Sequence, residues 1–219
     1  MTGAILVATA VSAEAEAVRA GLPPDAAVTV TPVGVGPAAA AAGTARLLAL
    51  AEAGGAPYTA VLSIGIGGGF PGRAAVGTLA LATRSVAADL GAESPAGFLP
   101  LDRLGFGDPV AAVDQGLLAR LRAGLPAASA GPVLTLATVT GTVATAAALT
   151  SRFPDAVAEA MEGYGVGVAA GQAGVPFAEL RAISNPVGPR DRAAWRIGDA
   201  LAALRAAAPA LADLAMVTG

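Results

Sequence analysis

Two apolar segments of the chain end on polar side chains that could act on a small ligand. The segment 175–184 suits a buried strand and is followed by Asn185, and a shorter segment ends at Met161 and is followed by Glu162. In open α/β sheets the ligand crevice lies at the carboxyl ends of the strands. A carboxylate delivered there can accept two hydrogen bonds from a vicinal diol, and an amide can offer a donor and an acceptor to a heterocycle edge.

Both residues also have plainer interpretations. Glu162 could be an exposed residue at a strand–helix junction, where the positive end of the helix dipole stabilises a carboxylate. Ser184, Asn185 and Pro186 could form a turn that simply ends the strand, and their position alone slightly favours this. The residues by themselves leave these alternatives open.

Three further segments could contribute to a site. Gly67-Gly68-Gly69 follows a buried strand and could present backbone N–H groups to a ligand, although a tight turn is the simpler interpretation. Glu14 opens the first predicted helix, where, taken singly, it suits a surface residue that compensates the helix dipole. Asp191 could cap the last helix, and Trp195 could belong to the core. The glycines match neither the dinucleotide nor the P-loop spacing.

The composition limits the chemistry that these residues can perform. The chain has no cysteine, no histidine and no lysine. Disulfides, thiolate and Schiff-base chemistry, cysteine-ligated metals and the Ser-His triad are therefore excluded. Catalysis would run on carboxylates, amides, hydroxyls and backbone dipoles, and no metal or organic cofactor is implied.

Charge and hydropathy bear on partners and location. The net charge is -3 and the arginines are scattered, so no basic stripe for nucleic acid is visible. Hydrophobic residues make up 55% of the chain, yet the uncharged stretches 26–45 and 133–151 are rich in Ala, Thr and Gly and have a weak drive to insert into a membrane. The apolar N-terminus lacks the basic start of a signal peptide. We expect a cytoplasmic α/β protein with neither a nucleic-acid nor a membrane partner.

Predicted strands and helices alternate along the chain. The strands are expected at 4–9, 28–33, 60–65, 77–86, 133–139, 156–161 and 175–184. The helices are expected at 13–20, capped by Ser12, and at 38–53, 114–123, 142–151, 163–173 and 193–214, the last interrupted near Pro209. The segment 93–107 is predicted as an irregular excursion. This alternation predicts one three-layer αβα domain over residues 1–219.

The order and spacing of these motifs resemble the nucleoside phosphorylase and nucleosidase superfamily over nearly the whole chain. The resemblance rests on Ala-Val-Ser-Ala-Glu at 10–14, the glycines at 67–69, Met-Glu-Gly at 161–163 and Arg-Ala-Ile-Ser-Asn at 181–185. Within the superfamily, Asn-Pro-Val-Gly-Pro-Arg-Asp at 185–191 with Trp195 is similar to the futalosine hydrolases, which remove hypoxanthine from futalosine on a menaquinone pathway. The resemblance implies a central mixed, partly barrel-like sheet and a homodimer or larger homo-oligomer.

The resemblance also implies roles for single residues toward a purine nucleoside and water. Glu162 would bind the ribose hydroxyls, with Met161 against the sugar, and Gly68 and Gly69 would supply backbone contacts. Asn185, which follows Ser184, would contact the purine at N7. Apart from the resemblance, we expect Asp191 to orient Asn185 or to protonate the leaving base through a water.

Two departures from the family pattern matter. Adenine-releasing nucleosidases have Asp at the position of Asn185, whereas the NH₂ of an amide can donate to N7 or O6 of a 6-oxopurine. The sequence therefore points to hypoxanthine or guanine as the released base. At the position of the water-activating Glu an ungapped comparison places Ala13, and Glu14, one residue later, matches a neighbouring Glu of the family; we expect Glu14 to assist the water as general base.

Hydrolysis is favoured over phosphorolysis. Phosphate binding normally uses arginine clamps, and the early part of the chain offers only Arg19, Arg46 and Arg73. Two other classes stay open, a purine nucleoside phosphorylase or other purine nucleosidase, and a nucleoside-binding protein without catalysis. The segment 93–107 is a candidate for contact with the aryl-carboxylate end of futalosine, although a surface loop is the simpler interpretation.

Overall fold

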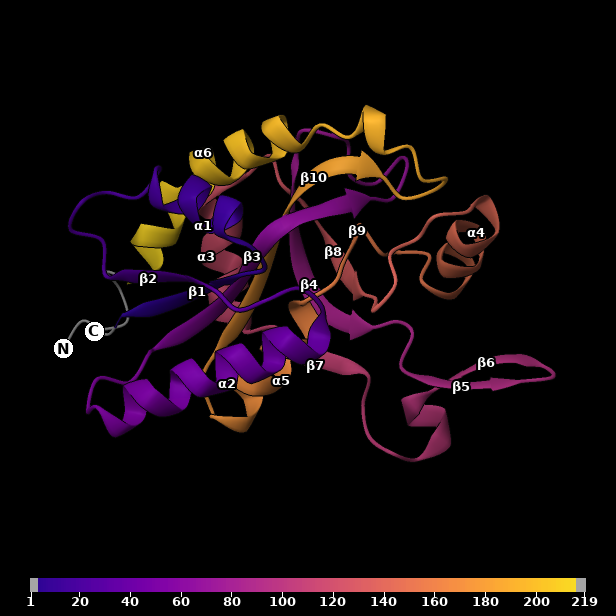
Figure 1. The fold of residues 1–219 in the computed structure, drawn as a ribbon, viewed down its shortest axis with the longest axis horizontal. Helices are drawn as coiled ribbons and strands as arrows, with labels where there is room; N and C mark the ends of the chain where they lie inside the picture. Colours follow the sequence, from indigo (N-terminus) through magenta and orange to yellow (C-terminus); the bar gives the residue numbers. More distant parts are fainter. Residues whose placement is uncertain (1–3, 216–219) are drawn as a thin grey trace.

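The structure is a computed structural model that describes residues 4–215, and it follows the predicted alternation of strands and helices (Figure 1). The strands are β1 (Ile5–Thr9), β2 (Val28–Pro32), β3 (Ala60–Gly69), β4 (Leu79–Ala87), β5 (Gly91–Ser94), β6 (Gly97–Pro100), β7 (Val110–Ala112), β8 (Ser129–Thr135), β9 (Ala158–Ala160) and β10 (Phe177–Pro186). The helices are α1 (Ser12–Arg19), α2 (Pro37–Ala53), α3 (Gln115–Gly124), α4 (Val143–Arg152), α5 (Gly163–Gln172) and α6 (Ile197–Ala215), with 3₁₀ turns η1 (Leu101–Leu104) and η2 (Arg192–Ala194).

The central sheet is mixed and closes on itself. Its strand order is β10-β4-β8-β9-β3-β1-β2, and β10 also pairs with β3, so that β3, β9, β8, β4 and β10 form a ring. Strands β1, β2, β3 and β10 run parallel, whereas β9 is antiparallel to β3 and β4 is antiparallel to β10. This confirms the expected mixed, partly barrel-like sheet.

Helices cover the sheet on two sides, as the three-layer prediction requires. Figure 1 shows α1 and α6 on one side of the strands and α2 and α5 on the other. Helix α6 packs against both α1 and α3, and α2 packs against α5. The apolar strand interiors, such as Leu6, Leu62 and Leu180, are fully buried between these layers. The buried framework fixes the strand ends that carry the site.

Several local predictions are corrected. Gly67-Gly68-Gly69 belongs to β3 and does not form a loop, because all three glycines pair with β10 and the last two also pair with β9. The N-cap of α1 is Val11 and not Ser12, because the Glu14 carboxylate accepts hydrogen bonds from the N–H groups of Ala10 and Val11. Strand β8 begins and ends earlier than expected, because its pairing with β4 starts at Ser129 and the chain leaves the sheet after Thr135.

The segment 93–107 and the last helix also differ from expectation. The former contains an antiparallel hairpin of β5 and β6 followed by η1, and the hairpin extends away from the body of the sheet (Figure 1). Strand β7, which pairs with β4, was not predicted. Helix α6 continues through Pro209, because the buried Ala208, Leu211 and Ala212 beside the proline keep this face packed.

No helix within residues 4–215 is both long and apolar enough to cross a membrane.

Candidate active site

A cavity of about 250 Å³ opens at the carboxyl-terminal side of β1, β3 and β10, beside β9. Its position is the one expected for a ligand site in a sheet with parallel strands. Its wall is formed by strand ends and by the segments that follow them. These residues are Ala10, Val11, Glu14, Val35, Ile66, Gly67, Gly68, Val139, Thr140, Glu159, Ala160, Met161, Glu162, Ser184, Asn185 and Trp195.

Glu14 reaches this cavity from the first turn of α1, directly after β1. Its side chain is only 3% exposed, so it is not a surface residue. Oε2 accepts hydrogen bonds from the N–H groups of Ala10 (2.9 Å) and Val11 (3.3 Å), and Oε1 accepts one from Ile66 (2.9 Å). These backbone donors fix the carboxylate, while Oε1 keeps capacity for one further hydrogen bond toward the cavity.

Glu162 lies at the junction of β9 and α5 with its side chain turned into the cavity. It is the N-cap residue of α5, yet its side chain makes no capping hydrogen bond, and it is 6% exposed. Oε1 accepts from the Gly36 N–H (3.2 Å), and Oε2 accepts from the Met161 N–H (3.3 Å) and from Arg181 Nη1 (3.2 Å). Gly36 is the N-cap of α2, so two helix N-termini stabilise the negative charge of Glu162.

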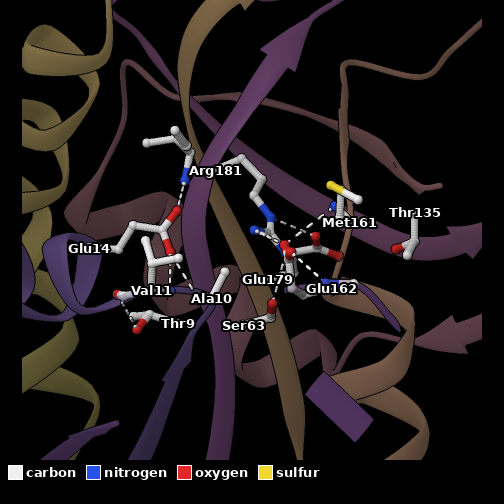
Figure 2. Close-up of polar contacts among 12 residues, drawn as sticks. Thr9, Ala10, Val11, Glu14, Ser63, Thr135, Met161, Glu162, Glu179 and Arg181 are labelled. Carbon is white, nitrogen blue, oxygen red and sulfur yellow. Dashed lines mark hydrogen bonds and ion pairs between the residues drawn. The ribbon is translucent and has the colours of Figure 1, made fainter. Parts of the chain in front are cut away.

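Arg181 links Glu162, which lines the cavity, to the buried residues Glu179 and Ser63. Its side chain is 1% exposed and uses all three nitrogens, with Nε donating to Glu179 Oε1 (2.9 Å), Nη1 to Glu162 and Nη2 to Ser63 Oγ (2.9 Å). Figure 2 shows this cluster beside the separate group around Glu14. Burial alone would lower the pKa of Arg181, but the carboxylates of Glu179, Glu162 and Glu14 outweigh it and raise the pKa above its usual value. Arg181 therefore stays charged and fixes Glu162.

Ser184 and Asn185 lie at the end of β10, where the pairing with β3 is irregular. The register shifts between Ile183 and Asn185, and such a bulge re-aims the side chains that follow it. The buried Ser184 hydroxyl donates to Asn185 Oδ1 (2.8 Å), and Asn185 Nδ2 donates to the Pro186 carbonyl (3.0 Å). The amide is thereby oriented with one N–H of Nδ2 left to donate to a ligand.

Glu159 is a cavity residue that the sequence analysis did not identify. It is 4% exposed, and its carboxylate accepts from the Thr140 N–H at Oε1 (2.9 Å) and from Thr140 Oγ1 at Oε2 (2.5 Å). Burial raises the pKa of Glu159, and the two bonds from Thr140 only partly oppose this. In the sequence, Glu159 could have been recognised as a site residue because it is a charged residue inside the short apolar strand predicted at 156–161.

The other predicted site residues divide into two groups. Met161, Gly68 and Ser184 line the cavity together with Glu14, Glu162 and Asn185. Gly69 does not line it, because it pairs with Ala158 and Pro186 one step further along β3. Asp191 is exposed and accepts from the Ala193 N–H (3.2 Å), which caps the turn η2.

Arg181 and Glu179 were also missed as a pair. They stand two residues apart on β10, so their side chains lie on the same face of the sheet. Opposite charges at this spacing inside an apolar strand are the signal for a buried ion pair. Among the described residues no group of three or more His, Cys, Asp and Glu side chains could hold a metal ion.

Comparison with known proteins places the chain in a family. Residues 5–217 match the model of the phosphorylase superfamily. A futalosine hydrolase from Streptomyces coelicolor is 52% identical over 225 residues, which cover 96% of this chain and 95% of that protein. A futalosine hydrolase from Acidothermus cellulolyticus is 46% identical over 223 residues, which cover 94% of this chain and 89% of that protein.

Solved structures share the fold at low sequence identity. An S-adenosylhomocysteine nucleosidase from Streptococcus pyogenes in complex with 5-methylthiotubericidin superposes with a TM-score of 0.80 at 20% identity, covering 100% of this chain and 99% of that chain. A futalosine hydrolase of Helicobacter pylori superposes with a TM-score of 0.76 at 18% identity, covering 99% and 98%. The sequence matches show that the present chain belongs to the phosphorylase superfamily and, within it, to the futalosine hydrolase family.

Proposed function

We propose that the chain is an N-ribosyl hydrolase that cleaves futalosine to hypoxanthine and dehypoxanthine futalosine in menaquinone biosynthesis. One observation carries the proposal. A single cavity holds a carboxylate on α1, a second carboxylate fixed by the N-cap N–H of α2, the Met161 N–H and Arg181, and an oriented amide at the end of β10. In this order, the three groups can activate a water, bind a ribose and bind a base. The family relationship to futalosine hydrolases supports this assignment of substrate.

Glu162 is proposed to hold the ribose. Its Oε1 accepts the hydrogen bond from the Gly36 N–H, and among the described residues no second donor bonds this oxygen, which leaves it able to accept one further hydrogen bond from a ribose hydroxyl. Met161 lies beside it on the cavity wall, where its side chain can pack against the sugar. A fixed carboxylate also stabilises the positive charge that develops on the sugar in an oxocarbenium-like transition state.

Asn185 is proposed to hold the base. Since Oδ1 accepts from the Ser184 hydroxyl, the amide presents Nδ2 to the ligand, and a 6-oxopurine offers N7 and O6 as acceptors. Trp195, which follows the turn capped by Asp191, completes the wall on this side. We assign Asp191 to holding this turn, because its carboxylate is already used as the cap.

Glu14 is proposed as the general base. A water that donates to Glu14 Oε1 would attack the anomeric carbon on the face opposite the base. The water oxygen forms a bond to C1′, one water proton passes to Glu14, and the bond from C1′ to N9 breaks with its electron pair leaving on the purine. The departing hypoxanthine takes up a proton from solvent, so that the reaction consumes one water overall.

The arginines of the first third of the chain do not form a phosphate site. The guanidinium of Arg19 donates to the Val30 carbonyl, and that of Arg73 donates to the carbonyls of Phe153 and Ala156. Neither of these residues nor Arg46 lines the cavity. Phosphorolysis needs such a clamp, so the arrangement favours water as the nucleophile.

The assembly and location of the enzyme are part of the proposal. We expect a cytoplasmic homodimer or larger homo-oligomer, because large apolar side chains on and next to the β5–β6 hairpin and η1 are exposed, namely Phe106 (78%), Leu90 and Leu99. Light scattering of the purified protein measures its molar mass and so tests the expected oligomeric state. The hairpin residue Phe98 packs against Arg152 (4.0 Å to the ring centroid) and does not line this protomer's cavity.

One assay tests the reaction. The protein is incubated with futalosine and with inosine, each with and without phosphate, and free hypoxanthine is measured. We expect release from futalosine alone that does not depend on phosphate. Phosphate-dependent cleavage of inosine would instead identify a phosphorylase, and binding without turnover would identify a nucleoside-binding protein. Glu162→Gln should lose most of the rate, and a variant that retains most of it would contradict the proposed role of Glu162.

A further inference from the structure

We infer that Glu159 binds the base and selects a 6-oxopurine over a 6-aminopurine by accepting a hydrogen bond from N1–H. This inference rests on the proposed function and deepens it, because it identifies a second specificity residue beside Asn185. Its basis is the register of three strands, the contacts of the Glu159 carboxylate and the different hydrogen-bonding edges of the two purine classes.

Glu159 and Asn185 share one register partner. Gly68 of β3 pairs with Asn185 of β10 on one side and with Glu159 of β9 on the other. Residues in register on neighbouring strands direct their side chains to the same face of a sheet. Glu159 and Asn185 therefore flank Gly68 and project to the same side, and all three line the cavity.

The glycine between them leaves room for both side chains. A β-carbon on Gly68 would lie 3.2 Å from Asn185 Nδ2 and 3.5 Å from Glu159 Cγ. The amide nitrogen of Asn185 and the Cγ of Glu159 thus both lie close to Gly68, and the Glu159 carboxylate extends from there to Thr140, which also lines the cavity. A donor and an acceptor placed in this way match the edge of a planar base.

The contacts of Glu159 leave it free to bind a ligand. Within residues 4–215 no cation forms an ion pair with Glu159, and its two carboxylate oxygens accept hydrogen bonds from the N–H and the hydroxyl of Thr140. Each oxygen accepts one hydrogen bond and keeps capacity for another. A buried carboxylate without a cation is costly unless further donors satisfy it, and a donor from the base would meet this need.

The two purine classes differ at the atom that would face Glu159. A 6-oxopurine has a donor at N1–H beside the acceptor O6, whereas a 6-aminopurine has an acceptor at N1 beside the donor N6. With Asn185 donating to O6 or N7, a carboxylate is complementary to N1–H of the former. The N1 lone pair of a 6-aminopurine would face the carboxylate without a proton between them. A site strongly rejects a ligand that leaves buried polar atoms unpaired.

A purely structural role for Glu159 predicts a different result. If the carboxylate only fastens the segment around Thr140, its loss should lower the activity on every substrate by the same factor. Glu159→Gln separates the two roles. Because the Thr140 N–H donates to Oε1, the oxygen of a glutamine is held at this place, and its NH₂ group takes the place of Oε2. A donor then replaces an acceptor with little change in shape.

The experiment compares kcat/KM for futalosine and for its 6-amino analogue. In Glu159→Gln we expect the ratio of the 6-oxo to the 6-amino value to fall by at least about 100-fold. The control is Thr140→Val, which removes one bond to Glu159 and leaves its carboxylate in place. This control should lower both values alike, and its ratio should stay close to that of the wild type. An unchanged ratio in Glu159→Gln would overturn the inference.

A second measurement needs only the wild-type protein. Hypoxanthine and 1-methylhypoxanthine, which lacks N1–H, are compared as product inhibitors, and we expect the methylated base to inhibit at least about tenfold more weakly. Equal inhibition would overturn the inference even where Glu159→Gln does not fold. If the wild type releases no hypoxanthine from futalosine, the proposed function itself fails. If it does release hypoxanthine and the ratios above do not change, only the role of Glu159 fails.

Discussion

Glu14 and Arg181 approach each other across Gly65. A β-carbon on Gly65 would lie 2.7 Å from Glu14 Oε1 and 2.9 Å from Arg181 Nη1. The same Nη1 donates to Glu162, so one guanidinium lies between the carboxylate proposed to activate water and the carboxylate proposed to hold the ribose. This relationship couples the two halves of the site, and it depends on a residue without a side chain in the middle of β3.

The first prediction is that Gly65→Ala removes most of the activity. The added methyl group would contact Glu14 Oε1 and Arg181 Nη1 at distances that real side chains do not tolerate, so at least one of these groups must move. A displacement of about 1 Å in a catalytic group costs about 100-fold in rate. We expect a loss of this size in kcat for hypoxanthine release, measured together with the melting temperature.

Gly171→Ala is the matched control. Gly171 lies in the last turn of α5, and a β-carbon there would meet no atom within 4 Å. Alanine is favoured over glycine in a helix by up to about 1 kcal/mol, so this variant should be fully active and no less stable than the wild type. Full activity of Gly65→Ala would show that the approach of Glu14 and Arg181 is not needed for the reaction.

The second prediction is that Arg181→Lys loses both stability and activity. Arg181 bonds Glu179, Glu162 and Ser63 with three different nitrogens, and a lysine ammonium cannot reproduce this fork. At least one buried partner would be left unpaired, which costs about 1–3 kcal/mol or more in the free energy of unfolding. Urea denaturation and kcat should both show the loss.

A surface arginine supplies the comparison. Arg84 forms an ion pair with Asp155 (3.1 Å), and the two side chains are 46% and 58% exposed. Arg84→Lys should therefore change the free energy of unfolding by no more than about 0.5 kcal/mol. If both substitutions had equally small effects, the buried network could not be what fixes Glu162.

The third prediction is that Asn185→Asp weakens the release of a 6-oxopurine. Aspartate keeps an acceptor for the Ser184 hydroxyl but presents no N–H donor to N7 or O6 when it is ionised. It also brings a second carboxylate beside Glu159 across Gly68. We expect kcat/KM for futalosine at pH 7.5 to fall by about 100-fold. Gln172→Glu, an equal change of charge at the exposed end of α5, should leave the rate unaltered.

The sequence predicts the edge of the sheet at which the site lies, because the apolar runs that end at Ser184 and Met161 are long enough to be recognised as buried strands. Glu162 and Asn185 follow these runs directly, and the structure brings both into one cavity. Helix-forming segments are also found near their predicted places, and Asp114 and Thr142, at which two of the predicted helices begin, are the N-caps of α3 and α4. These parts of the prediction depend on neighbours in the sequence.

The parts that could not be predicted depend on partners far away in the chain. Gly67-Gly68-Gly69 looks like a turn, and only its pairing with β9 and β10 makes it a strand. Glu159 looks like a polar residue in a short apolar segment until Gly68 places it opposite Asn185. The burial of Glu14 likewise follows from the backbone donors Ala10, Val11 and Ile66, the last of which lies on another strand.

The last prediction concerns the dependence of stability on pH in the ligand-free protein. Burial raises the pKa of Glu159 above its ordinary value of 4.5, so between the unfolded and the folded pKa the folded protein binds more protons at this residue. The contribution of Glu159 to stability therefore falls as the pH rises from about 4.5 through the folded pKa, and it is constant above that.

Glu159→Gln removes this titration. Measured by urea denaturation from pH 4 to pH 8, the free energy of unfolding of the wild type should decrease relative to that of the variant as the pH rises, and a difference independent of pH would contradict the raised pKa.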